Sequence, residues 1–339
     1  MLDRRTLMFA LASTAFFRPP PASAASETVR IGQATITLGF LPVWAARTFD
    51  TFAQQGLDLS WAAINGGDPA ALAALDSGDI DLAATGSDTV LEAVSKGQPY
   101  EIIYSLMSKM SLNLTVSTAF LKRSGAAKEQ PVEERIRSLR NALIGVAVVG
   151  GAQDRTVRWL AKRGGLDPRK DVRVVQIGSA PALGAALENG TIDGFMLSAP
   201  EGQLAEAAGY GQIFIEPDLD FPDIHGMPSL VLVARQEANQ AAQAKIVASL
   251  RALNAGSRAL IDNLDGGSDL LRGKFFSKIP ADVMRKSIHS LADGIRDEGL
   301  LNQERAALLV KFVEESGRKP PEGSAFWTDR YLVSAKAAN

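Results

Sequence analysis

The side chains able to do chemistry in this chain are mainly hydrogen-bonding groups. The sequence has no cysteine and two histidines, His225 and His289. A thiolate nucleophile, a disulfide and a cysteine-based metal site are therefore excluded, and a multi-histidine metal site is disfavoured. We predict no metal and no cofactor. What remains is a group of short stretches rich in glycine, hydroxyls and carboxylates, a composition typical of small-molecule binding.

These stretches supply the candidate site residues. They are residues 35–42, 65–68 and 85–88 in the first part of the chain, and 149–154, 178–180 and 197–201 further along. Several lead into a predicted helix, where free N–H groups bind anions. The predicted ligand-binding residues are Thr35, Thr37, Phe40, Trp44, Asn65, Gly66, Asp68, Thr85, Gly86, Ser87, Gly151, Gln153, Asp154, Ser179, Ser198, Glu201 and, from a later loop, His225. None is predicted to be catalytic.

Several of these residues also have a purely structural interpretation. Asp68, Ser87 and Asp154 are residue types that cap helix N-termini. Phe40 and Trp44 could stack on a flat ring. At helical spacing, however, a tryptophan is often a core residue. His225 is isolated in its loop.

The charges of the six stretches bear on the ligand. They contain Asp68, Asp88, Asp154 and Glu201, but no lysine or arginine. Arg155 follows immediately and Arg47 lies along the first predicted helix. Backbone N–H groups alone can hold an anion, although a cationic side chain is the easier solution. The acidic residues favour a neutral hydrogen-bonding ligand or an amine.

A repeated motif shows how these stretches are positioned. "PAALAALDSGDIDL" at 69–82 matches "PALGAALENGTIDG" at 181–194 without a gap, at an offset of 112 residues. Each copy predicts a helix that starts near its proline, ends at its glycine and leads into a strand at Ile-Asp. The repeat therefore indicates two similar structural units.

Each unit reads strand, helix, strand, helix, strand. Before the first copy come predicted strands at 28–35 and 57–64, separated by a helix over 41–56. Before the second come strands at 142–150 and 171–178, separated by a helix over 154–165. This alternation predicts an α/β fold of two lobes with mainly parallel sheets flanked by helices.

The remaining segments predict how the lobes connect. Residues 113–120 lead into the second unit, 229–236 lead back, and the tail after about 237 shows only helical patterning. We assign 25–112 plus 236–339 to lobe 1 and 113–235 to lobe 2. Two crossings form a hinge. Because open α/β sheets bind ligands beyond the carboxyl ends of their strands, both lobes would face one cleft.

The first 24 residues read as a cleaved signal peptide. Arg4 and Arg5 precede an apolar run over 7–17, and Ala22 and Ala24 fit cleavage after Ala24. We predict a soluble protein exported by the Sec or twin-arginine route. The net charge of −2, with no basic tract, argues against nucleic acid as a partner.

The chain resembles the periplasmic substrate-binding proteins of ABC importers, in the branch for nitrate, taurine, aliphatic sulfonates and thiamine-pyrimidine precursors. The resemblance rests on "GFLPVWAARTFDTFAQQGLDLSW", "ALAALDSGDIDLAATGSDTVLEAVSKGQP", "GGLDPRKDVRVVQIGSAPALGAALENGTIDGFM" and "FWTDRYLVSAK". "SLRNALIG" departs from the usual D-L-K-G-K entry to lobe 2. The resemblance implies a two-lobed, type II-like fold. It also implies a monomer that delivers a small molecule to a membrane permease and its ATPase, with no chemistry on the ligand.

Three alternatives use the same fold. One is a ligand-sensing periplasmic protein that docks on a receptor. Another is an enzyme, disfavoured by the export signal and the absence of cysteine. The third is the effector domain of a transcription regulator, for which no DNA-binding helix pair precedes the fold.

Overall fold

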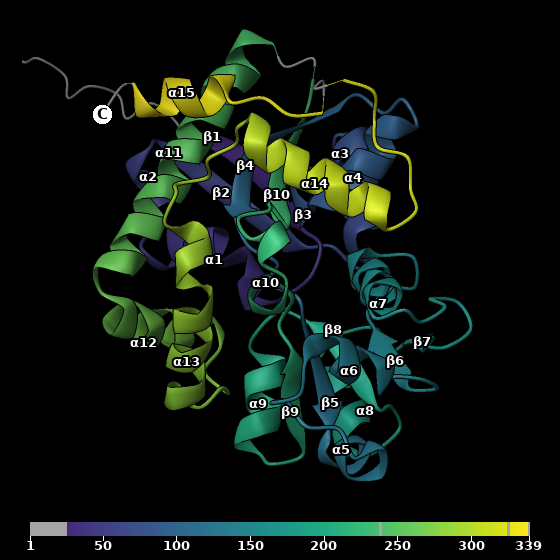
Figure 1. The fold of residues 1–339 in the computed structure, drawn as a ribbon. Helices are drawn as coiled ribbons and strands as arrows, with labels where there is room; N and C mark the ends of the chain where they lie inside the picture. Colours follow the sequence, from purple (N-terminus) through teal and green to yellow (C-terminus); the bar gives the residue numbers. More distant parts are fainter. Residues whose placement is uncertain (1–25, 237–238, 324–325, 338–339) are drawn as a thin grey trace, which may run out of the picture.

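Two five-stranded sheets covered by helices make up the computed structural model, which describes residues 26–236, 239–323 and 326–337 (Figure 1). The predicted signal peptide lies outside these residues. The first sheet has the order β2-β1-β3-β10-β4, with β1 Glu27–Gln33, β2 Leu57–Ala63, β3 Leu82–Gly86, β4 Tyr100–Met107 and β10 Leu230–Arg235. The second has the order β7-β6-β8-β5-β9, with β5 Asn113–Ser117, β6 Leu143–Val146, β7 Arg173–Gln176, β8 Gly194–Leu197 and β9 Gly211–Ile215.

Each sheet has two parallel and two antiparallel pairings, whereas mainly parallel sheets were predicted. β1 pairs in parallel with β2 and β3, and β6 pairs in parallel with β7 and β8. β10 and β5 are antiparallel to both of their neighbours. These two strands follow the two passages of the chain between the sheets, from β4 to β5 and from β9 to β10. The mixed α/β fold class is confirmed.

The helices fall into groups beside each sheet. The half built on the first sheet, here lobe 1, contains η1 Leu38–Phe40, α1 Leu41–Thr48, α2 Thr51–Gln54, α3 Gly67–Ser77, α4 Ser87–Ser95, α11 Gln240–Asp262, α12 Leu264–Phe275, α13 Ala281–Leu291, η3 Ala292–Ile295, α14 Gln303–Glu315 and α15 Arg330–Lys336. The half built on the second sheet, here lobe 2, contains α5 Thr118–Ser124, α6 Val132–Arg137, α7 Ala152–Arg163, α8 Ala180–Glu188 and α9 Glu201–Ala207. The short α10 Pro217–Asp220 and η2 Pro222–Ile224 lie on the return path. No helix in the ranges described is long and apolar enough to cross a membrane.

Several predicted elements are shorter than expected. The helix predicted over 41–56 is two helices, because Asp50 between α1 and α2 adopts a left-handed conformation with φ 53°. The strand predicted over 142–150 ends at Val146, after which the chain turns to line a cavity. The elements therefore have the predicted type and order, whereas their ends are set by the loops between them.

The Ile residue of the repeated motif packs the same way in both lobes. A Cβ atom on Gly32 of β1 would lie 2.6 Å from Cδ1 of Ile80, and one on Gly145 of β6 would lie 2.7 Å from Cδ1 of Ile192. A real Cβ atom does not fit at such distances. Each isoleucine thus occupies the space left by a glycine in the first strand of its unit, β1 or β6.

The Asp residue of the motif joins the same strands. Asp81 accepts a hydrogen bond from the backbone N–H of Arg30 (2.8 Å), and Asp193 accepts one from the backbone N–H of Leu143 (2.9 Å). A buried or half-buried backbone donor needs such a partner. The two copies of Ile-Asp therefore have the same function, which is to attach the start of the third strand of each repeated unit (β3 or β8) to its first strand (β1 or β6).

In the described part of the chain, the C-terminal helices pack mainly on lobe 1, and two of their contacts with lobe 2 show how they reach it. Helix α11 contacts α1, α2 and α15, and α14 contacts α4 (Figure 1). Helix α14 also reaches α7, where Glu315 accepts a hydrogen bond from Nε1 of Trp159 (2.9 Å) and the ring of Phe312 lies 5.2 Å from that of Trp159. The second of these contacts is that of α13 with α9.

Candidate ligand-binding cleft

Two adjoining cavities lie between the sheets. The inner cavity has a volume of about 50 Å³ and the outer about 940 Å³. Both are lined by residues just beyond the carboxyl ends of parallel strands, such as Thr35 after β1, Ser87 after β3 and Ser179 after β7. Because both lobes contribute, a ligand here would contact both halves of the protein.

The structure gathers most of the predicted residues around these cavities. The inner cavity is lined by Thr35, Thr37, Phe40, Asp68, Ser87, Gly151, Gln153 and Ser198. The outer cavity is lined by Thr35, Asn65, Gly66, Ser179 and Glu201. Five predicted residues line neither cavity: Trp44, Thr85, Gly86, Asp154 and His225. Contact of any of them with a ligand stays a prediction.

Trp44 lies in the core behind the cleft. It is 2% exposed, and its ring centroid lies 5.2 Å from that of Trp61 and 4.9 Å from that of Phe276. Its Nε1 donates to the backbone oxygen of Thr37 (2.8 Å). Trp44 therefore positions the loop that carries Thr37. His225 has a largely exposed ring, 3.2 Å from the Asp218 carboxylate.

Asp68, Ser87 and Asp154 belong to residue types that cap helices, but each lies inside the first turn of its helix. The N-cap positions of α3, α4 and α7 are held by Gly66, Gly86 and Gly151. Asp154 instead accepts a hydrogen bond from the N–H of Gly150 (2.8 Å), and Gln153 accepts one from Ala147 (2.6 Å). Both side chains thus hold the loop of lobe 2 that faces the cleft.

Asp68 links lobe 1 to the start of α7. One carboxylate oxygen accepts hydrogen bonds from the Thr85 hydroxyl and the Gly86 N–H, both at 2.9 Å. The other lies 3.5 Å from the backbone nitrogen of Ala152 in lobe 2. A Cβ atom on Gly86 would lie only 3.1 Å from that of Ala152. The absence of a side chain at Gly86 thus permits the close approach of the lobes.

We expect Asp68→Ala to lower the free energy of unfolding by about 2 kcal/mol, because two buried donors, the Thr85 hydroxyl and the Gly86 N–H, lose their acceptor. Asp68→Asn retains an oxygen acceptor and should lose less than about 1 kcal/mol. Urea denaturation followed by circular dichroism measures both variants. Equal losses would show that the hydrogen bonds to Asp68 do not stabilise the fold.

A buried ion cluster lies beside the inner cavity, which its member Asp88 lines. Asp88 of α4 forms ion pairs with Arg155 of α7 and, at 3.1 Å, with Arg318 beyond α14. Burial alone would raise the pKa of Asp88, but Arg155 and then Arg318 bring it below its ordinary range. Asp88 is 5% exposed. The cluster therefore neutralises the charge of Asp88 and joins the two lobes.

The two arginines nearest to the predicted stretches both interact with other side chains of the protein. Arg155 belongs to the ion cluster. Arg47 lies over the rings of Trp44, Trp61 and Phe275, with distances to the centroids of 4.8, 4.0 and 4.3 Å. Burial lowers the pKa of Arg47. Neither arginine lines a cavity, so neither offers its charge to a ligand there.

Unlike these two arginines, Glu201 lines the outer cavity, and it has no charged partner among the described residues. It is the first residue of α9 and is 9% exposed. Its Oε2 atom is buried and has no hydrogen-bond partner among the described residues. Burial raises the pKa of Glu201 to about 7. The carboxyl is thus poised to exchange a proton near neutral pH.

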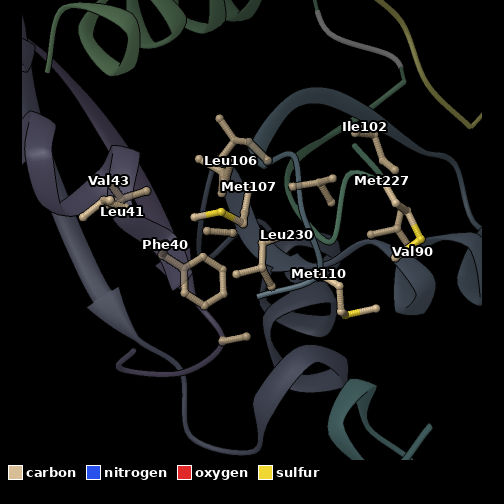
Figure 2. Packing of buried hydrophobic residues seen from close by; sticks show 14 of the residues in the cluster. Phe40, Leu41, Val43, Val90, Ile102, Leu106, Met107, Met110, Met227 and Leu230 are labelled. Atoms are coloured by element: carbon tan, nitrogen blue, oxygen red, sulfur yellow. The ribbon is translucent and has the colours of Figure 1, made fainter. Parts of the chain in front are cut away.

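Several residues that line the cavities were not predicted from the sequence, because they do not lie at the carboxyl ends of parallel strands. In the inner cavity these include Met110, Ser229 and Leu230. Figure 2 shows Phe40, Met110 and Leu230 within a cluster of buried hydrophobic residues. Ser229 lies at the amino end of β10, which reaches the cleft because β10 is antiparallel to its neighbours. Recognising the returning strand as antiparallel would have indicated Ser229.

The outer cavity is also lined by residues that were not predicted from the sequence. Phe275 and Phe276 line it from the end of α12, and Tyr210 lines it from the loop before β9. The phenylalanines lie in the C-terminal segment, for which the sequence predicts only helices packed on lobe 1. Their sequence "FFSKI" carries no signal for a cleft. Tertiary packing brings them there.

The amino-acid sequence also matches a known protein family. Residues 22–263 match the NMT1-like family. The bicarbonate-binding protein CmpA of Synechococcus elongatus is 27% identical over 292 residues, 73% of this chain and 63% of CmpA. This chain thus spans less than two thirds of CmpA.

Solved structures share the periplasmic-binding-protein fold. The ligand-binding component of an ABC-type import system from Staphylococcus aureus is 18% identical, with a TM-score of 0.71 over 91% of this chain and 99% of that one. The periplasmic nitrate-binding protein NrtA of Synechocystis PCC 6803 is 15% identical, with a TM-score of 0.69 over 92% and 88%. The fold and the resemblance seen in the sequence are both confirmed. The chain belongs to the NMT1-like family.

Proposed function

We propose that this protein is the solute-binding component of an ABC importer, acting in the periplasm as a monomer without chemistry on its ligand. The observation that carries the proposal is the pair of cavities between two sheets, lined from both lobes at the carboxyl ends of parallel strands. The relatives named above, whose names describe binding or import, support it. The captured solute would pass to a membrane permease and its ATPase.

The proposed mechanism is closure of two lobes about the two crossings. In this proposal lobe 1 comprises residues 25–112 and 236–339, lobe 2 comprises residues 113–235, and the crossings act as the hinge. Contacts between the lobes, such as the hydrogen bond between the hydroxyls of Ser111 and Ser198 (2.8 Å), favour the closed arrangement. A ligand shifts the population only by its preference for the closed state.

We expect a bound solute to raise the melting temperature and to reduce the radius of gyration. The experiment unfolds and refolds the protein to remove carried-over ligand. A thermal-shift screen then covers nitrate, bicarbonate, sulfonates, pyrimidines and aromatic amines. A native-state ligand stabilises by RT ln(1 + [L]/Kd). Any solute that stabilises is then tested by small-angle X-ray scattering. An unchanged radius of gyration at saturation would contradict lobe closure.

A further inference from the structure

One oxygen atom of a buried carboxyl group lacks a hydrogen-bond partner among the described residues. Glu201 lines the outer cavity, is 9% exposed and has an Oε2 atom with no hydrogen-bond partner in the part of the chain described. No lysine or arginine within those residues forms an ion pair with it. A buried polar atom without a partner costs free energy. A partner supplied by a ligand would remove that cost.

The walls around Glu201 are mainly apolar. Val148, Leu197, Leu204, Tyr210 and Phe276 line the same cavity. Two other charged residues line it, and both are exposed: they are Glu188 and Lys278. The cavity thus combines an apolar surface with a single buried charged group, which is acidic. Such a lining suits an organic molecule with one hydrogen-bond-donating end.

The inner cavity adds no cation. Its charged lining residues are Asp68 and Asp88, and Asp88 is already paired with Arg155 and Arg318. Asp68 accepts its hydrogen bonds from Thr85 and Gly86. An anion entering the inner cavity would meet acidic groups and no lysine or arginine in its lining. The outer cavity is lined by Lys278, but this residue is exposed, whereas the buried charged group there is Glu201, so the buried surface of both cavities disfavours an anionic ligand.

We propose that Glu201 anchors the basic nitrogen of an organic cation, an amine or amidine, whose apolar body lies against the walls of the outer cavity. The inference rests on the proposed function, since the cation would be the imported solute. It assigns to this chain a ligand class opposite in charge to the nitrate and bicarbonate that name two of its relatives. A charge-assisted hydrogen bond in an apolar site provides the selectivity.

The test compares two probes of the same shape and opposite charge. Benzylamine and phenylmethanesulfonate share a phenyl ring and a one-carbon linker. Their dissociation constants are measured by saturation-transfer NMR titration against the refolded full-length mature protein and Glu201→Gln. We expect benzylamine to bind the wild type and to bind Glu201→Gln at least about tenfold more weakly. We expect no binding of phenylmethanesulfonate to the wild type.

The control variant is Glu129→Gln, which removes the same charge from an exposed loop of lobe 2. It should bind benzylamine within about twofold of the wild type. Failure of benzylamine to bind, equal binding to wild type and Glu201→Gln, or tighter binding of phenylmethanesulfonate would each overturn the assignment. A sulfonate that binds and closes the lobes would leave the proposed function standing, so the two failures are distinguishable.

Discussion

Replacing Asp88 with alanine should lower the free energy of unfolding by about 3–5 kcal/mol in the absence of ligand. The substitution removes the buried partner of Arg155 and Arg318 and leaves their largely buried charges with the more distant and partly exposed Glu92. Removal of one partner from a buried ion pair is strongly destabilising because the remaining charge is not solvated. Urea denaturation monitored by circular dichroism at pH 7 measures the loss.

Glu92 provides the matched control for Asp88. It lies one turn further along α4, 3.5 Å from Arg155 and 3.6 Å from Arg318, but its side chain is 35% exposed. Glu92→Ala should therefore lose less than about 1 kcal/mol. Similar losses for the two variants would contradict the buried cluster as the main tie between the lobes.

The contribution of Asp88 to the free energy of unfolding should also depend on pH. Its pKa in the folded protein is lower than in the unfolded chain, so its stabilisation is fully present above the unfolded pKa of about 4. Stabilisation is lost as pH falls through the folded value. The difference between wild type and Asp88→Ala should therefore narrow below about pH 4.

Glu201→Gln should raise the free energy of unfolding by up to about 3 kcal/mol at pH 8. The folded pKa of Glu201 is about 7, above the value of 4.5 expected in an unfolded chain. The raised pKa means that stability present below pH 4.5 is lost as pH rises through 7. Glutamine carries no charge, so the variant escapes this loss. Denaturant midpoints measured from pH 4 to pH 9 give the curve.

Other titratable or charged groups lie near Glu201 and must be considered when the pH dependence of stability is compared between wild type and Glu201→Gln. Tyr210, Glu188 and Lys278 line the same cavity, and burial raises the pKa of Tyr210. Glu129→Gln, with the same charge change on an exposed loop, should alter stability by less than about 0.5 kcal/mol across the range. A stability difference for Glu201→Gln that does not grow between pH 5 and 8 would contradict a carboxyl that protonates near neutrality.

The α/β architecture could be predicted from the sequence, because the signals for it are local. Gly78 and Gly190 adopt φ values of 79° and 69° where the repeated motif predicts that a helix ends. Strand-helix alternation then predicts parallel sheets with their loops at one edge. Thr35, Asn65 and Ser179 could be placed at the cleft for that reason, because they follow strands β1, β2 and β7.

The groups that meet across the cleft could not be predicted from the sequence, because they are brought together by the packing of distant segments. Arg155 is 67 residues from Asp88 in the sequence, and Arg318 is 230 residues away, so no periodicity connects them. Phe276 reaches the outer cavity from a C-terminal helix. Glu201 has its raised pKa because of burial, a property that depends on the surrounding elements together. Charge pairing and desolvation act through space, and the order of residues along the chain does not specify them.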